Sequence, residues 1–264
     1  MNRHSQKLGF INQRNPQSGM IIIFAVFAAM ALFRDTNHRS PQQIVAFLAS
    51  FTIATAIHEF CHAYVALKLG DRTAADLGRV TLNPMAHFDP FGFFGMVMIS
   101  IGYGFIGWGK PVPVNPARFT NKRLRHHRHG MAIVAVAGPI SNLIQAAVVA
   151  IPLRIAGVPF SDFGKDAGFG MLAWTFVYVN LLLAAFNMIP IPPLDGSKLL
   201  LGIVPKFWYG VLAPLEQYGF ILLMGLFFLP IFLPGNYTDS IISALISPPF
   251  ELFTRYIIGF PLGY

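Results

Sequence analysis

The sequence predicts an all-α integral membrane protein of five or six transmembrane segments, with a re-entrant or strand-like insertion around residues 91–116. Of its 264 residues, 55% are hydrophobic and only 11% are charged, whereas soluble domains contain roughly 25% charged residues. Several apolar runs approach or exceed the roughly 20 residues that cross a bilayer. Short polar segments separate these runs, and no internal repeat is visible. We therefore expect one membrane-embedded domain over residues 1–264.

Five apolar runs are expected to cross the membrane. A first run is short for a span, a second is long enough to cross, and three more follow; in chain order they are Met20–Phe33, Ile44–Leu69, Met131–Leu153, Met171–Ile189 and a stretch ending near Leu233.

Two other apolar runs are irregular. Phe91–Trp108 contains five glycines, which favours a broken, re-entrant or strand-like segment over a clean helix. The last run, Ile241–Ile258, is interrupted by the Ser247-Pro248-Pro249 sequence, so it either crosses the membrane or lies along the interface.

The basic residues indicate the orientation in the membrane. The Lys110–His129 loop contains six Lys or Arg residues and no Asp or Glu, and such loops are typically cytoplasmic. Tracing the spans from a cytoplasmic, basic N-terminal tail places the second half of Ile44–Leu69 towards the cytoplasm of a multi-pass protein of the cell (plasma) membrane. The net charge of +8 then reflects topology and attraction to anionic lipids rather than nucleic-acid binding. We expect His126, His127 and His129 of the loop to be solvated.

The HEFCH sequence inside the second span predicts a metal site. Positions i and i+4 share one face of a helix, so His58 and His62 present two imidazoles to one point, as two zinc ligands require. Glu59 is placed to accept a proton from a water molecule at the metal. A chance pattern is the alternative, but ionisable residues within a span are usually functional. Cys61 points elsewhere on the helix and is expected to pack as a small apolar residue.

A third ligand is expected in the NMIPIPPLDG sequence, residues 187–196. Its three prolines must break the Met171–Ile189 span, because proline lacks the N–H donor and clashes with the preceding turn. The break places Asp195 on the cytoplasmic side of the membrane, the side already assigned to His58 and His62. The alternative role of Asp195 is to cap a helix that starts near Ser197.

Together, HEFCH in an early span and NMIPIPPLDG in a later one resemble the site-2 proteases, a family of intramembrane zinc metalloproteases. The likeness extends to GRVTLNPMAHFDPFG (78–92), GWGKPVPVNPARF (107–119) and AGPISNL (137–143), and covers roughly residues 44–200, with 201–264 as accessory segments. It implies one Zn²⁺ per chain held by His58, His62 and Asp195, with Glu59 as general base. The chain resembles a minimal form without a PDZ-like or CBS-like domain, which leaves open how substrates are selected.

Further residues are candidates for supporting roles. Asn187 is predicted to donate to the developing oxyanion, with Asn142 as its competitor or, alternatively, as an inter-helical hydrogen-bonding residue. In KPVPV (110–114) the prolines remove the N–H donors of one edge, so Val112 and Val114 are expected to bind an unwound substrate as an added strand. A rigid proline-rich loop is the alternative.

His87 and Asp89, in a polar turn region, are expected to have structural or supporting roles rather than to bind the metal.

Two other function classes remain open at this point. A zinc-binding membrane transporter would use the same ligands as a transport site, but it would be expected to repeat ligands along a path, and one cluster is visible. An inactive, protease-like protein that binds membrane helices is the second, although Glu59 is present. The expected partners are a transmembrane protein substrate and the lipid bilayer, with no nucleic acid; the sequence does not indicate the oligomeric state.

Overall fold

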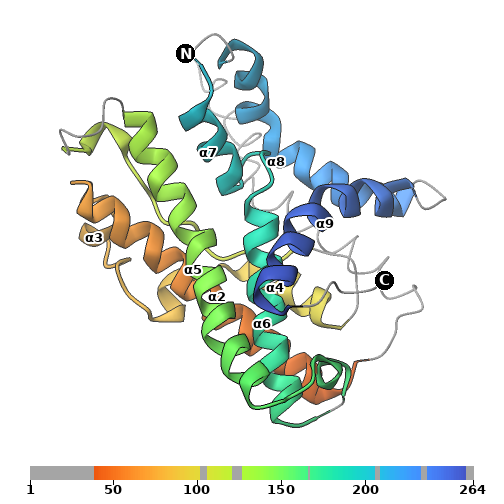
Figure 1. Ribbon diagram of the computed structural model, residues 1–264. Coiled ribbons are helices and arrows are strands. Elements are labelled where there is room, and N and C mark those ends of the chain that lie inside the picture. Colours follow the sequence, from red (N-terminus) through yellow and green to blue (C-terminus); the bar gives the residue numbers. More distant parts are fainter. Residues whose placement is uncertain are drawn as a thin grey trace, which may run out of the picture. The chain divides into compact units, whose positions relative to one another are not determined.

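The computed structural model describes residues 39–101, 106–120, 127–165, 167–205, 209–232 and 237–259 (Figure 1). Within these ranges all regular structure is helical and no strand occurs, which confirms the all-α class for this part of the chain. The longer helices are α2 (Pro41–Lys68), α5 (His127–Ile155), α6 (Phe169–Asn187), α8 (Tyr209–Phe232) and α9 (Tyr237–Ile257). The shorter ones are α3 (Thr73–Asp76), α4 (Pro90–Ser100), α7 (Asp195–Ile203) and the 3₁₀ turns Pro84–His87, Pro116–Arg118 and Phe160–Gly164.

Three helices in the described ranges are long and apolar enough to cross a membrane. They are α2, α5 and α6, with 28, 29 and 19 residues, and they coincide with three of the predicted spans. Each packs against the other two. The first predicted run, Met20–Phe33, lies outside the described residues, so a total of five or six spans stays a prediction.

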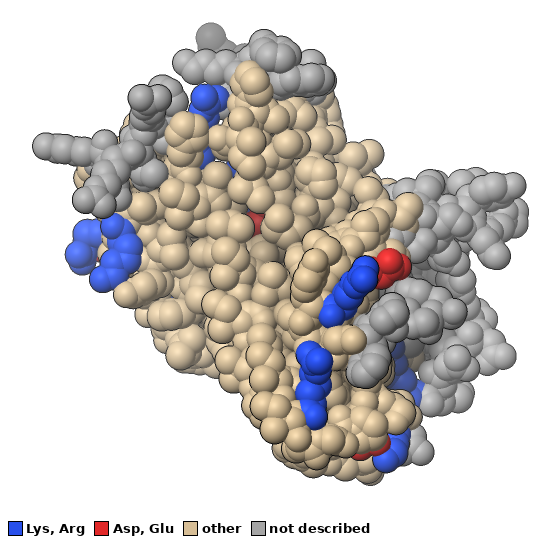
Figure 2. Space-filling model, viewed as in Figure 1, with Lys and Arg blue, Asp and Glu red and all other residues tan. Residues whose placement is uncertain are grey.

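The outer face of α5 explains why a membrane suits this fold. Large apolar side chains recur every three or four residues along it and remain exposed: Ile140, Ile144, Val148, Ile151 and Ile155. Residues at this spacing share one face of a helix, and a continuous apolar stripe of this kind marks an interaction surface. Figure 2 shows a face of the molecule made mostly of uncharged residues, with Lys and Arg side chains in a few separate places. The protein is therefore a membrane protein.

Local sequence sets the limits of α2. Ser40 accepts a hydrogen bond from the N–H of Gln43, and the Gln43 side chain accepts one from the N–H of Ser40, while Pro41 occupies the first helical position. This capping box satisfies donors at the helix start. At the other end, Gly70 has a φ of 111°, a conformation that residues with a Cβ rarely adopt. The chain thus turns away directly after Lys68.

The prediction of a strand-like segment is wrong for residues 91–100. They form the α-helix α4, which Asp89 caps by accepting from the N–H of Gly92. The glycines that suggested a break are instead contact points: a Cβ on Gly95 would overlap the carbonyl group of Ile106, and one on Gly92 that of Trp108. Residues 106–115 have no regular secondary structure. A re-entrant path through the membrane stays a prediction.

The expected interruption of the last apolar run is also wrong. Helix α9 continues through Pro248 and Pro249. A proline removes one N–H donor without forbidding the helix, and membrane helices tolerate it where neighbouring helices pack closely. Ile246 and Phe250, on either side of the prolines, pack in the cluster built around Trp174 of α6. Tertiary contacts therefore hold the helix together across this site.

Candidate metal centre

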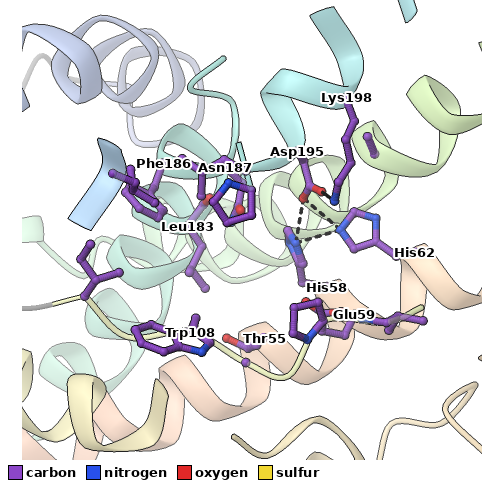
Figure 3. Close-up of a pocket in the computed structure, with 18 of the residues that line it drawn as sticks. Thr55, His58, Glu59, His62, Trp108, Leu183, Phe186, Asn187, Asp195 and Lys198 are labelled. Carbon is purple, nitrogen blue, oxygen red and sulfur yellow. Dashed lines mark hydrogen bonds and ion pairs between the residues drawn. The ribbon is translucent and has the colours of Figure 1, made fainter. Parts of the chain in front are cut away.

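Three buried side chains meet where α2 passes the start of α7. The Nε2 atoms of His58 and His62 lie 3.0 Å apart, and Oδ2 of Asp195 lies 3.2 Å from the first and 3.0 Å from the second. In Figure 3 the three side chains point towards one another. Among the described residues this is a cluster whose ligand atoms all lie within 4.8 Å of one another.

Asp195 reaches this cluster as the first residue of α7. Helix α6 ends at Asn187, directly before the proline-rich stretch, and α7 begins at Asp195 with Leu194 in the N-cap position. The alternative role of Asp195, capping a helix that starts near Ser197, is therefore wrong. Burial by itself raises the pKa of Asp195, but His62, His58 and Lys198 outweigh it. The pKa of the Asp195 carboxyl group thus lies well below its ordinary value.

Residues of helix α5 contact the Nδ1 atoms of both imidazoles and so orient the rings. Nδ1 of His62 lies 2.7 Å from the carbonyl oxygen of Val134, and Nδ1 of His58 lies 2.6 Å from Oδ1 of Asn142. A carbonyl oxygen only accepts, so Nδ1 of His62 is the donor to Val134, and Nε2 is the ring nitrogen that faces Asp195. Such outer partners are typical of metal-binding histidines.

The absence of a side chain at Gly138 makes room for the cluster. A Cβ there would lie 2.6 Å from Nε2 of His58 and closer still to Nε2 of His62. Two imidazole nitrogens, one carboxylate oxygen and a space kept open by a glycine fit the donor set of a catalytic zinc site, which has three protein ligands and an open position. The residues present therefore fit zinc.

Glu59 lies beside the cluster on the wall of a cavity of 560 Å³. Its side chain is largely buried, and Oε2 accepts a hydrogen bond of 2.8 Å from the backbone N–H of Val112. The cavity is lined mainly by apolar side chains, among them Phe51, Trp108, Phe186, Phe220 and Leu223. A carboxylate thus faces an apolar cavity that also contains the three clustered side chains.

The structure brings some of the other predicted residues to this cavity and not others. Asn187, Val112 and Val114 line it. The Nδ2 group of Asn187 donates to the carbonyl oxygen of Leu183 over 3.0 Å, within its own helix. Asn142 is fully buried behind His58 and donates to Oδ1 of Asn180 on α6, so the inter-helical hydrogen bond that the sequence left open as its alternative role is present.

Residues that were expected not to bind the metal lie outside the cluster. The Nε2 atom of His87 lies 2.9 Å from the carbonyl oxygen of Thr81, and Asp89 caps α4. Cys61 is partly buried and does not join the three clustered side chains. His127 is exposed and His129 is partly exposed at the start of α5, whereas His126 lies outside the described residues.

Sequence reasoning missed two polar residues, one that contacts a clustered side chain directly and one that reaches the cluster only through Asn142. Lys198 places its Nζ 3.1 Å from Oδ1 of Asp195, one helical turn along α7 (Figure 3). Asn180 hydrogen-bonds to Asn142 from α6. The sequence contained a signal for each. Lys198 is three positions after Asp195 and therefore shares its helix face, and the side-chain amide of Asn180, inside a span, needs a hydrogen-bond partner.

Comparison with known proteins identifies the family. The model of "Peptidase family M50" matches residues 152–232, a stretch that contains Asp195. The chain is 38% identical over 204 residues to the "Putative zinc metalloprotease YwhC" of Bacillus subtilis, which covers 75% of this chain and 83% of that protein. The chain belongs to peptidase family M50. It is accordingly a zinc metallopeptidase of the site-2 protease type, with zinc as its cofactor.

More distant relatives agree with this assignment. The "Putative zinc metalloprotease Rip2" of Mycobacterium tuberculosis H37Rv is 30% identical over 184 residues, 69% of this chain and 66% of that protein. The "Zinc metalloprotease MJ0392" of Methanocaldococcus jannaschii is 24% identical over 185 residues, 70% of this chain and 42% of that protein. No solved structure matches the chain.

Proposed function

We propose that this M50 peptidase hydrolyses a peptide bond in or near a transmembrane segment of a membrane protein, at the cytoplasmic side of the cell membrane. The position of His58 carries the proposal. It lies ten residues before the end of the 28-residue helix α2, about 15 Å at 1.5 Å per residue. The whole helix is about 42 Å long, and a hydrocarbon layer of about 30 Å centred on it would include His58.

The three clustered side chains are proposed to hold one zinc ion per chain. His58 and His62 supply Nε2 and Asp195 supplies Oδ2, the atoms that converge in the structure. Bound there, zinc supplies a Lewis acid that lowers the pKa of water and polarises a peptide carbonyl group. The proposed protein ligands number three, which leaves a position for water and substrate.

Glu59 is proposed as the general base. Its carboxylate takes a proton from the attacking water and then gives it to the nitrogen of the leaving amine, so the carboxylate is restored after each turnover. The hydrogen bond from Val112 orients Oε2 at the cavity wall. Asn187 lines the same cavity and is proposed to donate to the developing oxyanion after releasing the Leu183 carbonyl group.

The segment around Val112 and Val114 is proposed to receive the substrate. A transmembrane helix has to unwind before its peptide bonds can be reached, and the freed backbone groups then need partners. An irregular, proline-rich segment that lines the cavity offers backbone groups for such pairing. Asn142, in contrast, lies behind His58, so we assign it to orienting that ligand rather than to substrate contact.

Proteolysis and metal content, measured together, test the proposal. Purified full-length protein in proteoliposomes is given a panel of fluorogenic transmembrane peptides, and zinc is counted by mass spectrometry. Wild type should cleave at least one peptide with one zinc per chain, Glu59→Gln should keep zinc without cleaving, and the His58→Ala, His62→Ala double variant should lose zinc. Cleavage by Glu59→Gln at the wild-type rate would overturn the mechanism. Zinc uptake by the vesicles that survives in Glu59→Gln would favour a transporter instead.

Cysteine labelling tests the orientation. In a Cys61→Ala background, a membrane-impermeant maleimide should label Leu124→Cys only after intact cells are permeabilised. Ser161→Cys, in the loop after α5, is the matched control and should be labelled in intact cells. Labelling of Leu124→Cys before permeabilisation would reverse the proposed orientation.

A further inference from the structure

A row of polar side chains connects α6 to the candidate metal centre through the interior of the protein. Nδ2 of Asn180 donates to the carbonyl oxygen of Phe176 over 2.9 Å, and Oδ1 of Asn180 accepts from Nδ2 of Asn142 over 2.9 Å. Oδ1 of Asn142 then lies 2.6 Å from Nδ1 of His58. Both asparagines are fully buried, and neither lines the cavity around the clustered side chains.

The donor and acceptor of every hydrogen bond in this row follow from the carbonyl oxygen of Phe176, at the end away from His58. The Phe176 carbonyl oxygen only accepts, so the Asn180 amide must turn its NH₂ group towards it and its oxygen towards Asn142. The oxygen of Asn180 in turn accepts the NH₂ group of Asn142, which leaves the Asn142 oxygen facing His58. A longer contact of 3.5 Å from Asn142 to the carbonyl oxygen of Ala54 favours the same amide orientation. The Nδ1 atom of His58 therefore has to be the donor.

We propose that Asn180 is a positioning residue that sets the tautomer of His58 through Asn142. With its proton held on Nδ1, the neutral imidazole turns the lone pair of Nε2 towards His62 and Asp195, the form in which it binds a metal. The inference rests on the proposed role of His58 as a zinc ligand. Asn180 touches neither the ligand atoms nor the cavity, so it acts only through Asn142.

The two histidines differ in how their tautomers are held. His62 relies on the backbone carbonyl group of Val134, which no substitution of a side chain removes. His58 relies on two amide side chains from two other candidate spans, α5 and α6. The position of the proton on His58, unlike that on His62, is therefore open to single substitutions far from the metal.

Zinc affinity measured by competition with a chelator, on the full chain in detergent, tests the inference. Asn180→Leu keeps the number and branching of the side-chain heavy atoms but removes the acceptor for Asn142, and loss of an outer partner of a metal ligand weakens metal affinity by roughly 10–100-fold. Thr175→Val is the matched control. It deletes a buried hydrogen bond of the same helix, from Thr175 to the carbonyl oxygen of Met171, and should leave zinc affinity at the wild-type value.

A second pair of variants separates the tautomer from packing. Asn180→Asp, which is uncharged when protonated inside the membrane, donates its O–H to Phe176 and accepts from Asn142, so it should restore zinc affinity even if the leucine variant does not fold. In an Asn142→Leu background, which already removes the contact between this row and His58, Asn180→Leu should cause no further loss of zinc affinity.

Two outcomes overturn the inference. Wild-type zinc affinity in Asn180→Leu would show that the row of amides does not matter to the metal, and an equal loss in Thr175→Val would show a packing effect. Neither outcome bears on the proposed function, which fails instead if the His58→Ala, His62→Ala double variant keeps its zinc.

Discussion

The backbone N–H of Val112 donates to Oε2 of Glu59 over 2.8 Å, so an irregular segment is bound to the carboxylate that we propose as general base. Two further contacts hold this segment in place. Arg79 donates to the carbonyl oxygen of Lys110 over 2.7 Å, and Asp71 accepts from the N–H of Asn115 over 2.6 Å. From the sequence, the backbone N–H of Val112 was expected to donate to a substrate strand. In the structure, such a strand has to compete with Glu59 for it.

Substitution of Val112 by proline should slow turnover while zinc stays bound. The change deletes the donor that reaches Glu59, and a hydrogen bond to a charged group contributes about 1.5–3 kcal/mol, so we expect at least about tenfold slower cleavage. Val114→Pro removes a neighbouring donor and leaves the one on Glu59, which makes it the matched variant. Cleavage rates and zinc content of the two variants check this prediction. An equal loss of cleavage rate in both would mean that the segment acts through substrate pairing alone and not through Glu59.

Gly138→Ala should remove zinc binding. The new methyl group would lie 2.6 Å from Nε2 of His58, well inside van der Waals contact, and would push the imidazoles apart. Gly225→Ala on α8, where a Cβ meets no atom within 4 Å, controls for the general effect of a helical Gly→Ala change. Zinc content by mass spectrometry checks this prediction, and a Gly138→Ala protein with full zinc would contradict the geometry of the site.

Lys198→Met should weaken zinc affinity. Lys198 holds Oδ1 of Asp195 over 3.1 Å, which aims Oδ2 at the histidines, and losing such a partner costs roughly 10–100-fold in affinity. Its positive charge also opposes a cation, but a side chain that is 37% exposed is screened by solvent, so the orienting effect should dominate. Lys198→Arg should retain more affinity. Tighter zinc binding by the methionine variant would show that charge repulsion is the larger effect.

Asn187→Ala should keep zinc and reduce turnover. Removal of one oxyanion donor slows catalysis by roughly 10²–10³-fold. If Asn187 only satisfies the carbonyl group of Leu183, as it does in the structure, the rate should change little, because that contact lies within one helix. Single-turnover cleavage rates separate these outcomes, with Leu183→Ala as a control for altered packing of the same cavity wall.

Asp71 should make stability depend on pH. Burial raises the pKa of its carboxyl group, but hydrogen bonds from Thr73 and from the N–H of Asn115, together with the nearby Arg118 charge, outweigh burial and lower the pKa below its ordinary value. A lowered folded-state pKa means that the stabilisation is fully present above the unfolded pKa of about 3.9. It is lost as the pH falls through the folded pKa.

Asp71→Asn isolates this contribution. At pH 7 the variant should be about 1–3 kcal/mol less stable than wild type, since an amide replaces a carboxylate that accepts several hydrogen bonds. The difference should shrink as the pH falls below about 4, where the wild-type carboxylate becomes protonated. Thermal unfolding in detergent over this pH range, with both proteins free of zinc, provides the measurement. A difference that stays constant with pH would exclude Asp71 as the titrating group.

Local sequence was sufficient for the class of the protein and for its candidate ligands. Composition alone indicates a membrane protein, because too few charged residues exist to cover a water-facing surface. The spacing of His58 and His62 places both on one helix face whatever surrounds them. The prolines before Asp195 end α6 for a reason that lies within a few residues, the missing N–H donor. These conclusions hold because helix periodicity and proline geometry act over short stretches of chain.

Everything that orients those ligands required the folded arrangement, because it depends on residues far apart in the chain. His62 meets Asp195 across 133 positions, His58 meets Asn142 across 84, and Glu59 meets Val112 across 53. Local rules misjudged α4 and α9 for the same reason: glycines that would weaken an isolated helix let the 106–108 backbone approach α4, and packing against α6 holds α9 through its prolines. Long-range contacts, which no local pattern records, decide both the shape of these helices and the direction in which the two imidazoles face.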